Sequence, residues 1–486
     1  MAFLTGGANT LDDSYSIENS LRCNGTDSYL NFTLGTPTSQ RIATFSAWGK
    51  FNGQKSGSND TSFWSMGNDY GQAMNVVRTA GTPQIYLDDS DGKNISFNNG
   101  PNLRDPAAWY HFVVQIDTTQ STATNRMKWF INGTQLDNTT ASHEVSPDQN
   151  YDIPGLASGQ TMSISKRASS SSHYIDGYIA EMIYLDGSIA APTEFGEVDD
   201  NGVWIPKKPT GLTFGNNGAW LEFKQTGTSA NASGIGADTS GNGNHYTVNN
   251  LAAIDVTVDT PTNNFCTWNP LYKNSANPAY TPSSISEGNL KLTLQNDSAM
   301  LGTMGVSKGK WYWEYKLAEN TADNQDYPVF GFATNSDTSS AGNMVGRGTS
   351  ATLGGTPRGQ LGSSRVNDAF DDPSLSANDI IGFYLDMDNE TLILHKNGSD
   401  WMGSGATNGL DFSSASYSNT PDGFFYPFVQ NNGQNITGDQ ANFGNPTFSI
   451  SSSHADANGY GSFEYNPTLS STNYYALCTK NLAEYG

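Results

Sequence analysis

The chain has 486 residues, of which 15% are charged, 12% are aromatic and 51 are glycine. Its formal net charge of −23 creates an acidic field that repels phosphate backbones, so nucleic acid is not expected as a partner. No apolar run approaches the ~18 residues that a membrane-spanning helix needs, so membrane insertion is not expected either. The length suits two or three domains.

The composition favours β-structure. Gly and Asn supply turns, while Tyr, Phe, Trp, Val and Thr fill pleated surfaces, and no long window rich in Ala, Glu, Lys and Leu competes with them. We therefore predict an all-β protein with many loops and almost no helix. The opening Met1-Ala-Phe-Leu-Thr-Gly-Gly7 lacks the charged and apolar regions of a secretory signal peptide, so we expect synthesis in a cytoplasm without export by that route.

The N-terminal part contains a series of predicted strands. Residues 43–50 alternate apolar and polar side chains as a half-buried strand does, and residues 109–117 form a similar run. Residues 126–134 end in an Asn-Gly hairpin turn. Residues 174–186 close the series, and residues 192–196 are compatible with a short helix. With the opening segment 20–30, this order resembles the laminin G-like or concanavalin A-like jelly roll, which implies a first domain over residues 1–200.

Residues 201–279 form a connector that either completes the first sandwich or joins it to the next domain. The connector contains Asp238-Thr-Ser-Gly-Asn-Gly-Asn-His245, whose sequence resembles that of a loop that commonly opens laminin G-like domains. Here the loop follows the predicted jelly roll instead of opening it. Both interpretations of the connector therefore stay open.

Residues 280–486 carry a second set of motifs. They are Gly309-Lys-Trp-Tyr-Trp-Glu-Tyr-Lys-Leu317, then the strand, acidic turn and return strand of residues 379–398, and finally Asn442-Phe-Gly444. Their order resembles a SPRY domain, an antiparallel β-sandwich that binds partners through its loops. The stretch from Ala333 to Arg365 is rich in Gly, Ser and Thr and longer than ordinary connections, so we expect it to be functional or mobile. The fold class is therefore predicted as tandem antiparallel β-sandwiches, a jelly roll and then a SPRY-like domain.

No catalytic pair of carboxylates is evident. Retaining glycanases need two carboxyl groups about 5 Å apart, which alternate positions of one strand provide. Glu181 and Asp186 are five residues apart and would face opposite sides of a regular strand, and Glu314 stands alone between aromatic residues. His111 lies within an apolar run, where a core role is expected. We therefore expect the chain not to be an enzyme.

Two kinds of binding residue are candidates. Calcium takes several oxygen ligands from a short loop, and side-chain oxygens alternate with other residues at Asp238, Ser240, Asn242 and Asn244. The alternative there is a solvated turn without a metal. Aromatic rings in polar loops suit sugar binding, and the candidates are Trp64, Tyr70, Trp401 and Tyr417, with Trp401 the preferred anchor. The alternative for each ring is a buried anchor of its loop.

Three segments resemble structural proteins of tailed bacteriophages. They are residues 184–206, residues 259–265 and residues 476–482. The resemblance implies a virion surface protein that is made in the host cytoplasm and contacts other virion proteins. It also implies a homo-oligomer, with a trimer preferred. A tail fibre or receptor-binding protein that recognises a host surface glycan or receptor is the first interpretation. The alternatives are a capsid decoration or head fibre protein, and a glycan depolymerase.

Overall fold

The computed structural model describes most of the chain. It covers residues 15–51, 61–67, 74–79, 82–87, 95–96, 103, 105–136, 147–168, 172–272, 284–295, 298–318, 328–334, 344–348, 358–361, 364–367, 369–370, 374–415, 423–431 and 435–486. Its contacts divide it into two compact units, with the boundary between Asn264 and Phe265. The first unit ends at Asn264, and the second runs from Phe265 to Gly486.

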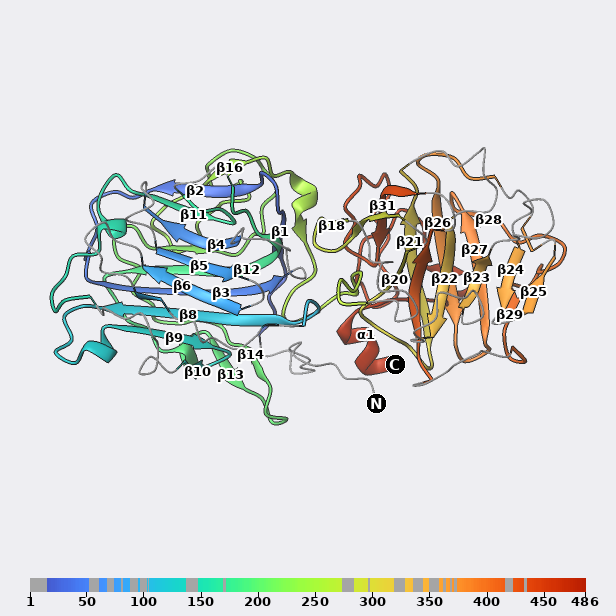
Figure 1. The fold of residues 1–486 in the computed structure, drawn as a ribbon, viewed down its shortest axis with the longest axis horizontal. Helices are drawn as coiled ribbons and strands as arrows, with labels where there is room; N and C mark the ends of the chain where they lie inside the picture. Colours follow the sequence, from blue (N-terminus) through green and yellow to red (C-terminus); the bar gives the residue numbers. More distant parts are fainter. Residues whose placement is uncertain are drawn as a thin grey trace. The chain divides into compact units, whose positions relative to one another are not determined.

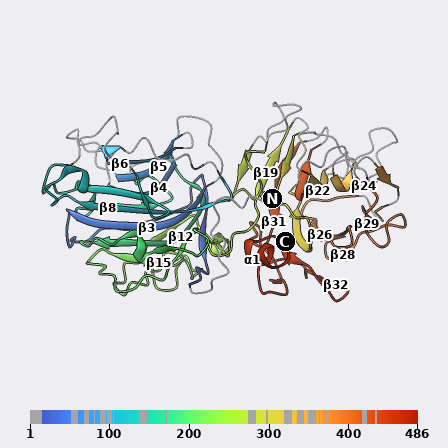
Figure 2. The same ribbon diagram turned by 90° about the horizontal axis from the view of Figure 1, so that it is seen from below.

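The first unit contains two large antiparallel sheets. The larger sheet has the order β10-β9-β8-β3-β12-β1-β17, with β15 also beside β12, and β8, β3, β12 and β15 can be followed in Figure 2. The smaller sheet has the order β16-β2-β11-β4-β5-β6-β7 (Figure 1). The larger sheet consists of β1 (Ser20–Asn24), β3 (Ile42–Phe51), β8 (Trp109–Asp117), β9 (Met127–Ile131), β10 (Thr134–Gln135), β12 (Asp176–Asp186), β15 (Ala219–Leu221) and β17 (Val256–Thr257). The smaller sheet consists of β2 (Tyr29–Thr33), β4 (Thr61–Met66), β5 (Met74–Thr79), β6 (Thr82–Leu87), β7 (Ile95–Ser96), β11 (Thr161–Ile164) and β16 (Thr247–Asn249).

Alternation along the strands gives the smaller sheet one apolar and one polar face, since residues paired directly across strands share a face. One row across its strands packs against the core between the two sheets: Val248, Leu30, Ile164 and Trp64. The adjacent row is polar: Thr247, Asn31, Ser163 and Ser65. The sandwich therefore turns a polar surface outward from β2 and β16.

The connector of the sequence analysis belongs largely to the first unit. Its strand β15 extends the larger sheet beside β12, β16 forms an edge of the smaller sheet, and β17 forms an edge of the larger sheet. A hairpin of β13 (Gly196–Val198) and β14 (Trp204–Pro206) places Trp204 against the larger sheet. Up to Asn264, the connector therefore completes the first sandwich.

The helices in the described part of the first unit are short 3-10 turns: η2 (Ala123–Asn125), η3 (Pro154–Leu156), η4 (Pro192–Glu194) and η5 (Ala253–Asp255).

The second unit also contains two large sheets. One has the order β18-β19-β31-β21-β26-β27-β28, with β29 beside β27 and β34 beside β21, and the other has the order β20-β30-β22-β23-β24-β25 (Figure 1). The first of these contains β18 (Ser284–Ser286), β19 (Lys291–Leu294), β21 (Lys310–Lys316), β26 (Ile380–Asp386), β27 (Thr391–Lys396), β28 (Ser399–Asp400), β29 (Leu410–Asp411), β31 (Ile436–Asn442) and β34 (Tyr475–Ala476). The second contains β20 (Ala299–Leu301), β22 (Val329–Thr334), β23 (Met344–Gly348), β24 (Arg358–Leu361), β25 (Ser364–Val366) and β30 (Phe425–Gln430). A small hairpin of β32 (Thr468–Leu469) and β33 (Thr472–Asn473) precedes α1 (Thr479–Tyr485), the one α-helix in the described ranges.

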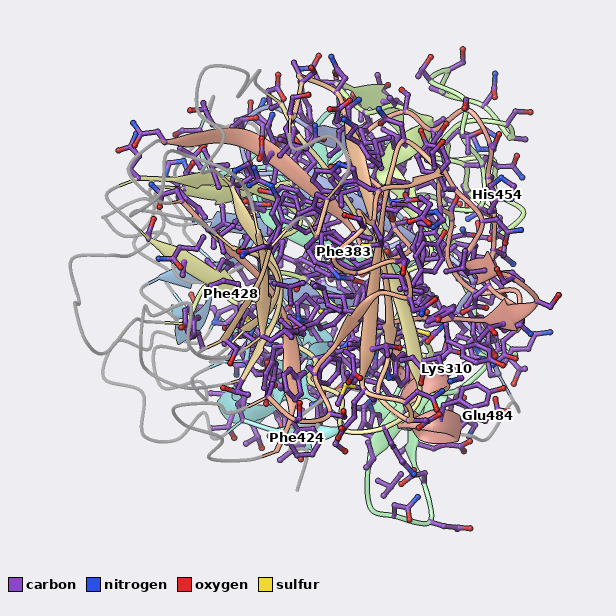
Figure 3. All side chains as sticks on the ribbon, turned by 90° about the vertical axis from the view of Figure 1, so that its right-hand side faces the viewer. Lys310, Phe383, Phe424, Phe428, His454 and Glu484 are labelled. Carbon is purple, nitrogen blue, oxygen red and sulfur yellow. The ribbon has the colours of Figure 1, made fainter. Side chains whose placement is uncertain are left out.

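Aromatic rings fill the core of the second unit. Trp313 of β21 stacks on Phe383 of β26 with 4.2 Å between ring centroids, and Phe383 lies inside the unit in Figure 3. Trp268 packs edge-on against Trp313 at 5.6 Å. Because Trp268 lies well before residue 280, the second core begins earlier in the chain than the sequence motifs indicate. The predicted fold class, an all-β chain of antiparallel sandwiches, is confirmed.

Candidate functional site

The predicted anchor Trp401 lies inside the second unit. Its side chain is only 2% exposed and packs against Phe370, with 4.7 Å between ring centroids. The ammonium of Lys396 lies 5.8 Å from the centroid of the Trp401 ring. The expectation of a ring presented at a loop tip is thereby corrected, because Trp401 completes an aromatic core instead.

Trp64 is also a core residue, 4% exposed, and its ring lies 4.0 Å from that of Phe45. It belongs to the apolar row of the smaller sheet, which corrects its assignment to a polar loop. Tyr70 and Tyr417 lie outside the described residues, as does much of the stretch from Ala333 to Arg365.

The candidate calcium loop is held together by its own hydrogen bonds. The carboxylate of Asp238 accepts from the backbone N–H groups of Trp220, Ser240 and Asn244 and from the Ser240 hydroxyl, at 2.8–2.9 Å. The side-chain amides of Asn242 and Asn244 both donate to the carbonyl oxygen of Gly218. In the part of the chain that the structure describes, no group of three or more His, Cys, Asp or Glu residues is arranged to hold a metal ion. The calcium site and the alternative of a turn without a metal both stay predictions.

Two carboxylates of β12 have separate environments. Glu181 is buried at a β-bulge with φ of +48°, where β1 stops pairing with β12 and β15 begins. The Tyr15 hydroxyl donates to Glu181, and burial raises the pKa of Glu181 to about 8. Asp186 accepts from the backbone N–H groups of Thr38, Ser39 and Asn217 and so fixes two loops. These contacts give Asp186 a structural role.

Glu314 in the second unit is a buried junction. Its carboxylate accepts hydrogen bonds from the Tyr312 hydroxyl, the Asn442 amide and the backbone N–H groups of Glu464 and Tyr465. Burial raises the pKa of Glu314 to about 7, although these four donors act in the opposite direction. The group ties β21 to the segment after β31, which explains a lone acidic residue between aromatics.

A partly exposed aromatic cluster lies on the outward face of the smaller sheet. The rings of Tyr29 and Tyr174 are 6.1 Å apart and tilted by 51°. The ammonium of Lys166 lies 4.2 Å from the Tyr29 ring centroid and 5.8 Å from that of Tyr174. All three residues are of intermediate exposure. We call these three residues the tyrosine cluster.

Amide groups flank the tyrosine cluster. Asn249 of β16 is the direct cross-strand partner of Tyr29, and Asn31 lies two residues along β2 on the same face. The Asn249 amide donates to the Asn31 side-chain oxygen at 2.7 Å. Among the described residues, no hydrogen bond engages the side-chain nitrogen of Asn31 or the side-chain oxygen of Asn249, which leaves a donor and an acceptor beside an aromatic ring.

The residues of this cluster were not among the binding residues predicted from the sequence. Tyr29 lies in the opening segment 20–30, and Tyr174 begins the last predicted strand of the series. The available signal was alternation: Leu30 faces the core, so Tyr29 and Asn31 must face outward. Bringing Tyr174, Lys166 and Asn249 to the same face required the fold.

Comparisons with known proteins give weak structural likenesses. No family model matches the chain, and no curated protein matches it. The SPRY domain of human HERC1 is 15% identical with a TM-score of 0.20, and the match covers 31% of this chain and 87% of that one. The CBM40 domain of a Ruminococcus gnavus sialidase, solved with alpha2,3 sialyllactose, is 17% identical with a TM-score of 0.24, covering 36% and 95%.

Tailspike protein 2 from the Escherichia coli O157:H7 bacteriophage CAB120 is 14% identical with a TM-score of 0.26, and the match covers 35% of this chain and 23% of the tailspike. Within the described residues, no helix is long and apolar enough to cross a membrane. Function therefore has to be inferred from the residues of the chain itself.

Proposed function

We propose that the chain is a glycan-binding surface protein of a tailed-bacteriophage virion, with a tail fibre or receptor-binding role and no catalytic activity. The observation that carries the proposal is the tyrosine cluster with its neighbouring amides on the outward face of the smaller sheet. Resemblance of three segments to phage structural proteins supports the virion assignment.

The chemistry of this surface suits a sugar ring. Glycan sites combine a flat aromatic surface for the C–H face of a sugar with a few fixed polar groups that orient it. The Tyr29 ring supplies the aromatic surface, and Lys166 and Tyr174 fix its position. Asn31 and Asn249 supply a donor and an acceptor side by side, as a pair of neighbouring sugar hydroxyls requires.

A single exposed cluster of this kind binds weakly, and assembly would strengthen attachment. Phage appendages are commonly symmetric, and linking several copies multiplies a weak affinity into avidity. We therefore propose a homo-oligomer, with a trimer preferred, in contact with other virion proteins. The same surface in a capsid decoration or head fibre protein would contact a neighbouring virion protein instead of a host glycan.

The direct test is a glycan array and a host-cell binding assay with the full chain and two single variants. Tyr29→Ala removes the aromatic surface, and we expect binding to fall more than tenfold because an anchoring ring contributes roughly 2 kcal/mol. Tyr29→Phe keeps the ring and serves as the matched control, with binding close to that of the wild type. Both variants should melt near the wild-type temperature, since Tyr29 is only partly buried.

Three outcomes separate the possibilities. A folded Tyr29→Ala variant that binds glycans and cells normally would remove the tyrosine cluster as the site. A wild-type chain that is found in purified particles but binds no glycan would favour the capsid decoration role. Absence of the chain from purified particles, measured by mass spectrometry, would contradict the virion assignment.

A further inference from the structure

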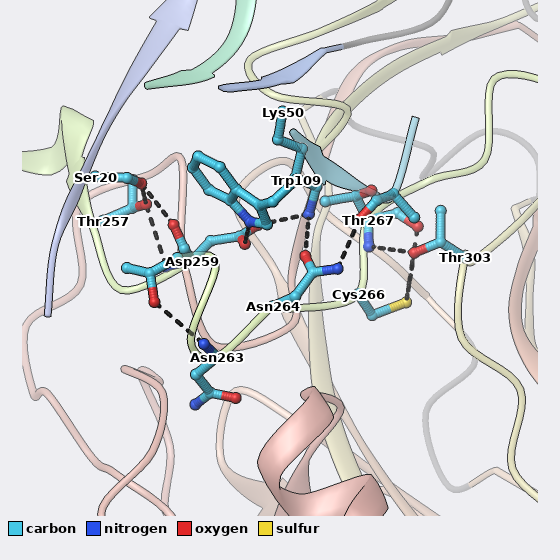
Figure 4. A network of polar contacts seen from close by, with 12 residues as sticks. Ser20, Lys50, Trp109, Thr257, Asp259, Asn263, Asn264, Cys266, Thr267 and Thr303 are labelled. Carbon is cyan, nitrogen blue, oxygen red and sulfur yellow. Dashed lines mark hydrogen bonds and ion pairs between the residues drawn. The ribbon is translucent and has the colours of Figure 1, made fainter. Parts of the chain in front are cut away.

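A lysine, an aspartate and an asparagine meet in the interior of the first unit. Lys50 is the penultimate residue of β3, while Asp259 and Asn264 belong to the segment that follows β17. The Lys50 Nζ atom lies 2.8 Å from Asp259 Oδ2 and 2.7 Å from Asn264 Oδ1 (Figure 4). The Lys50 and Asp259 side chains are only 2% and 0% exposed, so water has little access to the three groups.

Aromatic rings and backbone groups fix the positions of all three side chains. Trp109 Nε1 donates to Asp259 Oδ1 at 3.2 Å, and the Tyr178 ring centroid lies 5.3 Å from Lys50 Nζ. The Asn264 Nδ2 donates to the Ala107 carbonyl at 2.6 Å, which turns its Oδ1 and Cγ toward the lysine. Figure 4 shows Lys50 of β3 and Trp109 of β8 converging on Asp259 and Asn264, which belong to one segment.

A buried ion pair alone accounts for only part of this arrangement. Lys50 and Asp259 neutralise each other, yet burying such a pair gains little stability over an apolar replacement. Asn264, the third residue of the group, places the carbonyl group of its carboxamide directly against the lysine nitrogen. Acyl transfer to an amine needs an amine, an amide carbonyl and a group that carries a proton between them. The carboxylate can carry that proton, and all three groups are held together away from water.

We propose that Lys50 and Asn264 are joined by an intramolecular isopeptide bond, formed with Asp259 as the proton carrier. Asp259 accepts one proton from the Lys50 ammonium, and the lone pair of the neutral amine forms a bond to Asn264 Cγ. The bond between Cγ and Nδ2 then breaks. Asp259 donates the first proton to the leaving Nδ2 and accepts a second proton from the attacking nitrogen, which keeps one hydrogen in the new amide. The released ammonia takes this second proton from Asp259 and leaves as ammonium. In total, one ammonium group and one carboxamide yield one secondary amide and one ammonium ion.

The bond would join positions 214 residues apart in the chain. It would attach the end of β3 to the last residue of the first unit and so close almost the whole unit into a covalent ring. Such a cross-link acts as a disulfide does, by restricting the unfolded chain, but it needs no oxidising compartment. Cys23, Cys266 and Cys478 lie buried, and the proposed amide involves none of them.

Mass spectrometry of the purified full chain under denaturing conditions tests the proposal. We expect an intact mass below the sequence mass by one ammonia, together with a branched peptide that contains Lys50 and Asn264 after proteolysis. Asn-Gly sites also lose ammonia when they cyclise, so the branched peptide is the deciding observation. Wild-type protein without that peptide would overturn the proposal, whatever its intact mass.

Single variants test the roles of Lys50, Asn264 and Asp259 in forming the bond. Lys50→Arg and Asn264→Ala should show no branched peptide and should melt at a lower temperature than the wild type. Asp259→Asn keeps the side-chain volume, and we expect it to retain both reacting groups without joining them. A branched peptide in Asp259→Asn would overturn the role of Asp259. Lys310→Arg, which alters a lysine paired with Asp386 and Asp388 in the second unit, is the control that should retain the branched peptide.

Discussion

The Trp204 indole nitrogen donates a hydrogen bond of 3.1 Å to Nδ1 of His111. Because Nδ1 accepts, the neutral His111 ring carries its proton on Nε2, which lies 2.9 Å from the Ser46 hydroxyl and donates to it. The imidazole also stacks on Trp48, with 4.7 Å between ring centroids. Both ring nitrogens are thus engaged inside the first unit, and the β13–β14 hairpin is attached to the larger sheet through His111.

This environment predicts an acid-sensitive contribution to stability. Burial lowers the pKa of His111 from 6.5 to about 3, so between these values the unfolded chain binds a proton that the folded chain does not. The stability that the neutral imidazole provides is therefore lost as the pH falls from about 6.5 toward 3. Relative to His111→Gln, the wild-type free energy of unfolding should fall by up to about 1.4 kcal/mol per pH unit. Urea denaturation at several pH values measures the difference, and a pH-independent difference would contradict the prediction.

Glu181 predicts the opposite dependence. Its pKa is raised from 4.5 to about 8 by burial, so between these values the folded chain holds a proton that the unfolded chain has released. The wild type should therefore lose stability relative to Glu181→Gln as the pH rises from about 4.5 to 8, by up to about 1.4 kcal/mol per pH unit. The matched control is Glu197→Gln, which removes a carboxylate that is 45% exposed. An equal trend in both variants would count against the assignment to Glu181.

Replacement of Trp401 should affect folding and leave ligand binding intact. Trp401→Ala removes a core ring that contacts Phe370 and Phe330, and we expect a loss of about 3–5 kcal/mol in the free energy of unfolding. Trp401→Phe retains an aromatic ring and should lose less. Melting curves and the cell-binding assay on the same samples check this. A fully stable Trp401→Ala chain that no longer binds cells would restore Trp401 as a binding residue.

The loop of Asp238 provides a test of metal dependence. Since its carboxylate already accepts four hydrogen bonds, we expect the wild-type melting temperature to be the same in calcium and in a chelator. Asp238→Ala leaves those donors without their acceptor, and a loss of roughly 1–3 kcal/mol is expected. Ser240→Ala removes one donor and should cost less. A melting temperature that rises with added calcium would instead establish the loop as a calcium site.

The strands were predictable from the sequence because alternation is a local property. The predicted strand 109–117 coincides with β8, and the predicted strand 43–50 lies within β3. The end of the first unit was not predictable, since β15, β16 and β17 contain only two or three residues each and exist through pairing with distant strands. An aromatic residue in a polar segment can face either the core or the solvent, and composition does not distinguish the two. The burial of Trp401 was therefore not predictable without its distant neighbours. The meeting of Lys50 with Asn264 likewise depends on the complete fold.

The position of β1 between β12 and β17 also determines when the first unit can fold during synthesis. Leu21 pairs with Ile179 on one side and with Val256 on the other. Strand β1 is among the first to leave the ribosome. Both of its neighbouring strands are present only after more than 230 further residues have been translated. Such long-range pairing folds slowly and exposes strand edges in the meantime. Nascent chains stalled before Val256 should consequently be clients of chaperones, whereas chains released after Asn264 contain every described strand of the first sandwich.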